Sequence, residues 1–239
     1  MAPLTLALNV AIGILMVGSI IELSFISSMV GWLHRRAGRD FDINYNGSTF
    51  PLHGKPLGLL VDQGHTSNGA AGTAFVLIGM GGILALWLRS RATRTSSILS
   101  RIGMFWYYFW LAMTVPSILL TLAALIYTLV LTNNHDGQII DIAIAATLDN
   151  RPYPNYVAYP LDEWTPENWF GAVLQLPLTH NSDAGTIREH LRVMRGWRWN
   201  LIPMFIIGLA VCLIGMAEAW SRRRDVSSKM TVQEKRLSA

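Results

Sequence analysis

Two carboxylates lie inside apolar stretches of this 239-residue chain, and they are its strongest candidates for chemistry. Glu22 is the only charged side chain among the first 33 residues. A carboxyl group inside an apolar helix is costly, so it faces other helices and often marks the path of an ion or a proton. The alternative for Glu22 is a structural role, as a buried carboxyl hydrogen-bonded to Ser19, Asn9 or a neighbouring helix. Glu218 lies four residues before Arg222, a spacing that favours an ion pair.

The chain carries no sequence template for catalysis or for a cofactor. The sequence contains no nucleophile elbow and no phosphate-binding loop. It also lacks a dinucleotide-binding glycine motif that follows a strand. Gly79, Gly81 and Gly82 lie in an apolar stretch, where small residues favour close helix packing. The sole cysteine, Cys212, excludes an intrachain disulfide and a thiolate metal cluster. We therefore predict no catalytic residue, no metal and no cofactor. Six histidines are scattered without the spacing of a zinc site: His34, His53, His65, His135, His180 and His190.

The composition indicates an integral membrane protein. Hydrophobic residues make up 51% of the chain and charged residues 14%, against about 25% charged residues in typical soluble domains. Four stretches meet the length of about 20 apolar residues that a bilayer core requires: 1–33, 69–88, 102–132 and 199–220. Backbone amides in lipid must be paired within their own segment, so we expect an all-α protein with four transmembrane helices, arranged as a four-helix bundle. Seven of the nine tryptophans lie at the ends of these stretches, where indole favours the headgroup region: Trp32, Trp87, Trp106, Trp110, Trp197, Trp199 and Trp220.

The connecting segments differ in charge, and this difference predicts the topology. Segment 89–101 has four arginines and no acid, and the tail 221–239 has six basic residues against two acids. Short basic segments stay in the cytoplasm, so we expect both termini there and segments 34–68 and 133–198 outside. Three arginines directly after the first span argue for the opposite orientation of that helix: Arg35, Arg36 and Arg39. The formal net charge of +4 thus reflects topology, and we expect the bilayer, not nucleic acid, as the partner.

The outer loop 34–68 is rich in turn-forming residues around Asn46-Gly47-Ser48. We expect a compact loop with at most a short hairpin. The same three residues form a glycosylation sequon, which makes Asn46 a candidate acceptor and agrees with an outward loop.

The outer segment 133–198 is the only sizeable piece outside the predicted spans, with roughly 65 residues and short helices. Residues 138–146 fit either an extended strand or a short helix. Thr165-Pro166-Glu167 predicts the start of a helix that ends before Pro177. A second helix, with capping-box spacing at Thr186, is predicted to lie in the headgroup region. We expect three aromatic side chains to be exposed and to bind a partner: Trp164, Trp169 and Phe170.

Two resemblances follow from these features. Four spans with a larger second outer loop resemble the tetraspanin architecture, whereas claudin-like proteins have their larger loop first. Both families depend on loop cysteines, which this chain lacks, so their functional motifs cannot be carried over. The stretches 164–170 (WTPENWF) and 194–200 (MRGWRWN) look like segments of uncharacterised multi-pass membrane proteins of filamentous fungi, over about a third of the chain. This resemblance implies no activity.

Three functional hypotheses remain open. The leading one is a non-enzymatic membrane organiser or accessory subunit, acting through its outer segment on a membrane-protein partner or on a second copy. The alternative is a small transporter or channel that uses Glu22 and helix kinks at Pro116 and Pro203. The second alternative is a membrane-embedded enzyme with outward histidines such as His53 and His135 over a lipid-facing site.

Overall fold

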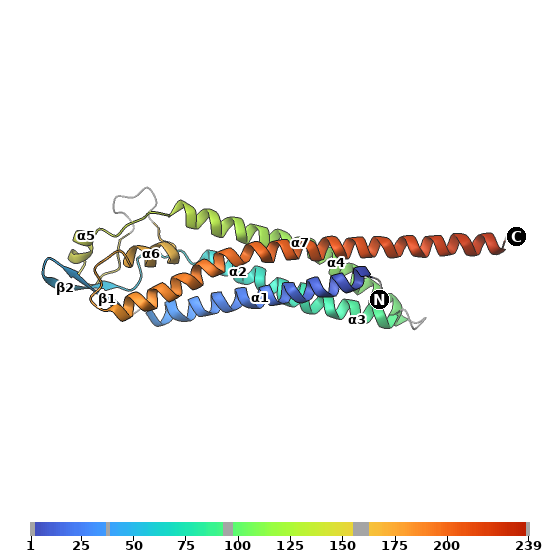
Figure 1. The fold of residues 1–239 in the computed structure, drawn as a ribbon, viewed down its shortest axis with the longest axis horizontal. Coiled ribbons are helices and arrows are strands. Elements are labelled where there is room, and N and C mark those ends of the chain that lie inside the picture. The colour runs from blue at the N-terminus through green and yellow to red at the C-terminus, as the bar shows by residue number, and fades with distance from the viewer. Residues whose placement is uncertain (1–2, 37–38, 93–97, 155–162, 238–239) are drawn as a thin grey trace. The chain divides into compact units, whose positions relative to one another are not determined.

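The computed structural model describes residues 3–36, 39–92, 98–154 and 163–237 (Figure 1). Within these ranges, four helices are long and apolar enough to cross a membrane. Each carries one of the four predicted apolar stretches: Pro3–Arg36, Asp62–Arg91, Arg101–Asn134 and Asn181–Arg224. The prediction of a helical chain with four membrane-spanning segments is therefore confirmed at the level of these helices.

The helices run further than the predicted spans, because an α-helix pairs its own backbone in water as well as in lipid. The second begins at Asp62, and the last continues without a break from Asn181 to Leu237, across the predicted outer helix, span and tail. In chain order the elements are α1 (Pro3–Arg36), β1 (Asp40–Tyr45), β2 (Ser48–His53), α2 (Asp62–Thr73), the π-helical η1 (Ala74–Met80), α3 (Gly81–Ala92), α4 (Ile98–Asn134), α5 (Ile142–Thr147), α6 (Pro166–Val173) and α7 (Asn181–Leu237).

The chain divides into two compact units, and each combines segments that are distant in the sequence. Unit 1 consists of Met1–Ile20, Ala70–Leu122 and Pro203–Ala239. Unit 2 consists of Ile21–Gly69 and Ala123–Ile202. Helices α1, α2, α4 and α7 contribute residues to both units, whereas the two strands, α5 and α6 belong to unit 2 alone.

Small residues bring the helices of unit 1 close together. A Cβ added to Gly79 would lie 2.5 Å from Met16 Cγ, and one added to Gly82 would lie 2.8 Å from the Trp110 ring. Gly79 lies within the π-helical segment η1, and Gly82 lies just after it in α3. The Ile78 carbonyl of η1 accepts a hydrogen bond from Trp110 Nε1 at 3.0 Å. The glycines in this stretch predicted close packing, but the π-helical segment has no comparable signal in the sequence.

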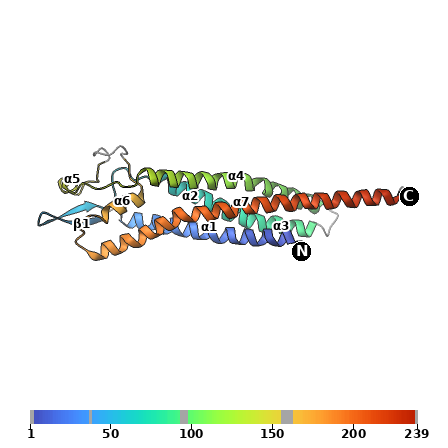
Figure 2. The same cartoon turned by 45° about the horizontal axis from the view of Figure 1, so that its top comes forward.

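Unit 2 contains the short hairpin predicted for the first loop. Strands β1 and β2 pair antiparallel around Asn46 and Gly47, which have φ of 50° and 78°. Positive φ at both positions suits a tight two-residue turn and explains an Asn-Gly pair there. Phe41 and Ile43 alternate along β1 and are fully buried. Strand β1 lies near α5 and α6 in both views (Figures 1 and 2), so the hairpin closes one side of a small core.

Within the segment 138–146, the helical alternative is correct from Ile142 onward, where α5 begins. Asp141 caps this helix, because its side chain accepts hydrogen bonds from the amides of Ala143 at 2.9 Å and Ile144 at 3.3 Å. The β-branched residues favour a strand, but the cap satisfies two amides that a helix start leaves unpaired. A strand over these residues was therefore the wrong alternative.

Helix α6 begins and ends where the sequence predicted. Thr165 Oγ1 accepts a hydrogen bond from the Asn168 amide at 3.2 Å, and Pro166 occupies the first turn. The helix ends at Val173, before Pro177. Both end signals are local, which is why the sequence could place this helix correctly.

The start of α7 corrects the prediction of a separate amphipathic helix from Thr186. The helix begins at Asn181, and Thr186 lies inside it. The apolar face of Ile187, Leu191 and Met194 is buried at 0%, 5% and 1% exposure. These side chains belong to the core of unit 2. This face therefore packs against protein and is not available to lie in a headgroup region.

Candidate functional site

A pocket of about 700 Å³ lies within unit 2. Sites for small molecules typically have volumes of about 300–1,000 Å³. The second half of α1 and the segment from Lys55 to Asn68 supply most of the wall, while α6 adds Pro166 and α7 adds Trp197. The pocket is thus assembled from four parts of the chain that are far apart in the sequence.

Most of the pocket wall is apolar. The aliphatic and thioether residues from α1 recur every three to four positions, so they share one face of the helix. The loop before α2 adds two more apolar side chains. An apolar wall of this kind suits a hydrocarbon group. The aliphatic and thioether side chains are Ile26, Met29, Val30, Leu33, Leu59 and Val61.

Two buried polar atoms of the lining have no hydrogen-bond partner among the described residues: Gln63 Oε1 and Trp197 Nε1. Both residues are buried, at 2% and 6% exposure. A buried polar group left unpaired costs about 1–3 kcal/mol, so such groups are rare in folded proteins. A hydrogen-bond acceptor on a ligand would pair the indole N–H, and a donor would pair the amide oxygen.

Three residues of the lining are titratable, and all three are bases: His34, Lys55 and His65. Each has an exposed side chain. His34 Nδ1 donates to the Val30 carbonyl at 2.8 Å, so Nε2 is the ring nitrogen that can meet a ligand. The described lining includes no acid, and Lys55 takes part in none of the ion pairs that the described residues form. The charged side of the pocket is therefore basic.

Glu22 lies one helical turn from this pocket. Its carboxyl is fully buried, and Oε2 accepts a hydrogen bond from Asn200 Nδ2 at 2.8 Å. Oε1 has no partner among the described residues. Along α1, Glu22 precedes Ile26 by four residues, and along α7, Asn200 follows Trp197 by three. Ser19 and Asn9, the alternative partners within α1, bond to backbone carbonyls of their own helix instead.

Glu218 lies in unit 1 and has a different environment. Its Oε1 accepts hydrogen bonds from Thr5 Oγ1 at 3.1 Å and from Arg222 Nε. Its Oε2 accepts from Arg89 Nη1 at 2.7 Å and from the Tyr107 hydroxyl at 2.8 Å. The pairing with Arg222 agrees with the spacing, but three further donors come from α1, α3 and α4. Because a carboxylate accepts about four hydrogen bonds, this one is fully used inside the protein.

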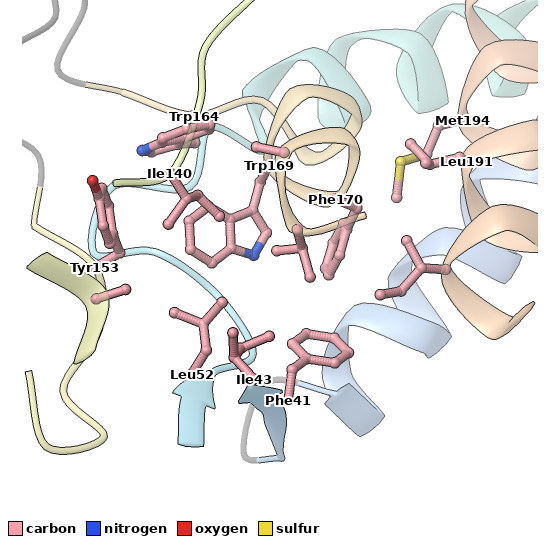
Figure 3. Close-up of a cluster of buried hydrophobic side chains, with 14 of the residues drawn as sticks. Phe41, Ile43, Leu52, Ile140, Tyr153, Trp164, Trp169, Phe170, Leu191 and Met194 are labelled. Carbon is pink, nitrogen blue, oxygen red and sulfur yellow. The ribbon is translucent and has the colours of Figure 1, made fainter. Parts of the chain in front are cut away.

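The expectation that Trp164, Trp169 and Phe170 are exposed is wrong. Their exposed fractions are 3%, 0% and 0%, and they lie in the core of unit 2 (Figure 3). The two indole rings meet edge to face with centroids 5.2 Å apart, and Trp169 Nε1 donates to the Gly54 carbonyl at 3.1 Å. The Phe170 ring meets Trp32 of α1 and Phe41 of β1, with centroids 4.3 and 6.4 Å apart, so these side chains build a core and are not exposed to a partner.

The remaining predicted residues lie apart from the pocket. Asn46 is exposed in the hairpin turn, and its glycosylation stays a prediction. His180 lies 3.3 Å from Asp42 at the surface of unit 2. Within the described ranges, no three His, Cys, Asp or Glu side chains are grouped so that they could hold a metal ion.

Glu167, outside the spans, has a pKa raised above its ordinary value. Burial is the main cause, and ion pairs with Arg198 and Arg195, each at 3.3 Å, oppose it. Nearby Asp136 raises the pKa further. The two ion pairs join the start of α6 to α7, so Glu167 has a structural role within unit 2.

Comparison of the chain with protein-family models, with curated proteins and with solved structures finds no match. The resemblance to multi-pass proteins of filamentous fungi, and the tetraspanin-like arrangement, therefore stay predictions. What can be proposed about function comes from the pocket and from the two buried carboxylates.

Proposed function

We propose that this chain is a non-enzymatic membrane protein, an accessory or organising subunit, whose unit 2 holds an amphipathic molecule taken from the bilayer. The pocket of about 700 Å³ carries the proposal. Ligand pockets are mostly apolar and have a few polar groups that fix the orientation of the ligand. This pocket has such a composition, with an aliphatic wall and the polar atoms of Gln63, Trp197 and Lys55.

The position of the pocket on α1 supports a ligand that arrives from lipid. Its α1 residues belong to the helix Pro3–Arg36, which is apolar enough to cross a membrane. Val30 and Val61 line the pocket and are 46% and 43% exposed. Apolar side chains that are open to the outside and continue into a pocket offer a hydrocarbon chain an uninterrupted apolar path.

Photolabelling tests this function. The probe is a monoacylglycerol with a photoactivatable acyl chain, added to the full chain in phosphatidylcholine nanodiscs, and labelled peptides are identified by mass spectrometry. We expect labelling to concentrate in residues 26–34 and 55–68. Gly31 lines the pocket, and no atom lies within 4 Å of a Cβ added there, so Gly31→Phe fills pocket space without a clash at Cβ.

The matched control is Gly13→Phe, on the same helix outside the pocket, where an added Cβ also meets nothing within 4 Å. Gly31→Phe should remove most of the labelling in the two segments, and Gly13→Phe should leave it unchanged. Labelling spread evenly over all apolar helix faces, and equal in both variants, would overturn the proposal.

We also propose that unit 2 faces the outside, with both termini in the cytoplasm, as the charges of the connecting segments predict. Asn46 lies in an exposed turn of this unit, which supports glycosylation if the unit is outside. Expression in a eukaryotic secretory system should give a glycosidase-sensitive mass that Ser48→Ala abolishes. Ser48→Ala removes the sequon and keeps Asn46 itself, at the loss of the hydrogen bond that Ser48 Oγ donates to the Tyr45 carbonyl at 3.0 Å. An unglycosylated chain whose Asn46 region is modified only from the cytosolic side would contradict this orientation.

A second candidate function is transport through Glu22, and one observation favours it. The carboxyl is fully buried and uses only one of its two oxygens within the described part of the chain. Buried acids in spans often bind or relay cations. Wild type and Glu22→Gln should then differ in proton or Na⁺ flux after reconstitution into vesicles. Equal flux in both, or none in either, would exclude this candidate.

A further inference from the structure

The charged side chains of the described lining are all basic, and this indicates which ligand charge the pocket favours. Lys55 is exposed at the pocket, and no carboxylate belongs to the described lining. Asp62, the acid next to the lining in the sequence, is exposed and does not line the pocket. A cationic ligand would therefore find no carboxylate among the described residues of the lining, whereas an anion would find Lys55.

The start of α2 adds to this positive potential. Gln63, Gly64 and His65 belong to the first turn of α2 and line the pocket. The N-terminal end of a helix carries a partial positive charge, which favours an anion nearby. Asp62 lies in the same first turn and offsets part of this potential, but its exposed side chain is outside the pocket lining, whereas Lys55 belongs to the lining.

The indole of Trp197 is an independent observation. Its N–H is a donor and cannot accept, it is buried, and no described residue pairs with it. Trp197 belongs to the pocket lining. A ligand oxygen in the pocket would pair this N–H and remove the cost of burying it.

We infer that the pocket binds a single-chain anionic amphiphile, with its acyl chain against the apolar face of α1 and its acidic headgroup beside Lys55 and the start of α2. This inference rests on the proposed function, because it specifies the headgroup of the molecule held there. A fatty acid and a lysophospholipid with a phosphate monoester share this chemistry. They differ in that only the lysophospholipid brings a hydroxyl to donate to Gln63 Oε1.

The test compares headgroups on one chain length. Radiolabelled palmitate, palmitoyl lysophosphatidic acid and monopalmitoylglycerol are bound to the full chain in phosphatidylcholine nanodiscs, and the dissociation constants are measured by scintillation proximity. We expect both acidic ligands to bind at least tenfold more tightly than the neutral one. Tighter binding of lysophosphatidic acid than of palmitate would identify the lysophospholipid as the better ligand, and the reverse would identify the fatty acid.

Two variants separate charge from hydrogen bonding. Lys55→Gln should weaken both acidic ligands about fivefold and leave monopalmitoylglycerol unchanged. Arg151→Gln removes the same charge from an exposed position of unit 2 outside the lining, and it should change nothing. Trp197→Phe keeps an aromatic ring and removes the donor, so it should weaken the acidic ligands about tenfold.

The outcomes distinguish this inference from the proposed function. If the three ligands bind with equal affinity, and Gly31→Phe abolishes binding of all three, the pocket holds amphiphiles but the acidic preference is refuted. If none of the three binds above the level of Gly31→Phe, both the inference and the proposed function fail. An acidic preference that Arg151→Gln reduces as much as Lys55→Gln would also refute the inference, because it would reflect general charge attraction.

Discussion

Glu218 in unit 1 and Glu22 in unit 2 are both buried inside apolar helices, but their surroundings are opposite. Glu218 accepts hydrogen bonds from four residues on α1, α3, α4 and α7, two of them arginines. Glu22 accepts one described bond, from the neutral amide of Asn200. The sequence alone suggested a structural role for Glu218 and a functional hypothesis for Glu22. The number and charge of the donors around each carboxylate support this distinction.

The difference also indicates how each unit is held together. In unit 1, one carboxylate connects four helices, and the π-helical segment and glycines let those helices approach closely. In unit 2, a cluster of aromatic and aliphatic side chains forms the core (Figure 3). We therefore expect unit 2 not to depend on Glu22 for packing. Met29 belongs both to this core and to the wall of the pocket. Four substitutions, in order of expected effect, test this comparison.

The largest effect is expected for Glu218→Gln. The amide has the same size but leaves the guanidinium groups of Arg89 and Arg222 without a counter-charge, and Arg89 is 4% exposed. Breaking a buried ion pair by removing one partner costs about 3–5 kcal/mol. Because two guanidinium groups lose the same counter-charge, the free energy of unfolding, measured by SDS titration in mixed micelles, should fall by about 5 kcal/mol, the upper end of this range. A loss below about 1 kcal/mol would show that the network is not what holds unit 1 together.

The second largest effect is expected for Trp169→Ala, in the core of unit 2. Trp169 is fully buried and makes ring contacts with Trp164 and Tyr153. Truncating a buried tryptophan to alanine costs about 3–5 kcal/mol, through lost burial and the cavity left behind. Hydrogen exchange should speed up in residues 40–53 and 163–178 while α3 stays protected. Trp87→Ala is the control, because Trp87 is 51% exposed and should tolerate the change.

These two sites also show what could be predicted from the sequence. The four apolar helices could be predicted, because about 20 consecutive apolar residues determine a span without reference to the rest of the chain. Helix α6 could be predicted for a similar reason, since Thr165 and Pro166 act within one turn. The burial of Trp169 and Phe170 could not be read correctly, because a local pattern defines an apolar face but not the element that covers it. The same holds for the apolar face of α7 after Thr186.

The pocket could not be predicted from the sequence, because its lining residues are far apart along the chain. Its wall combines residues 26–34 and 55–68 with Pro166 and Trp197, and only the tertiary structure brings them together. Trp197 is one of several tryptophans near the ends of the predicted spans, and this position gives no sign that its N–H is buried without a partner among the described residues. Gln63 had no signal at all, because a glutamine near a helix start is ordinarily exposed. The ligand site therefore depends on long-range packing, whereas the spans depend on local composition.

A smaller effect is expected for Thr165→Ala, which tests the local part of unit 2. The Thr165 side chain caps α6 by accepting from the Asn168 amide at 3.2 Å, and its loss should cost about 1 kcal/mol. The free energy of unfolding should fall by this amount, and Thr165→Ser should restore it. If Thr165→Ala costs as much as Trp169→Ala, the cap and not the aromatic core would determine the stability of unit 2.

The smallest effect on stability is expected for Glu22→Gln, the same chemical change as Glu218→Gln at the other carboxylate. A glutamine at this position can still accept from Asn200 Nδ2, and no described cation loses its partner. Replacing a buried acid that has no cationic partner by its neutral isostere removes a desolvation cost. The free energy of unfolding should therefore stay within about 1 kcal/mol of wild type or rise.

If Glu22→Gln destabilises the protein as much as Glu218→Gln does, Glu22 is a structural carboxylate and the contrast between the two units is wrong. If stability is kept while ion flux changes, the spare oxygen of Glu22 serves function and not folding.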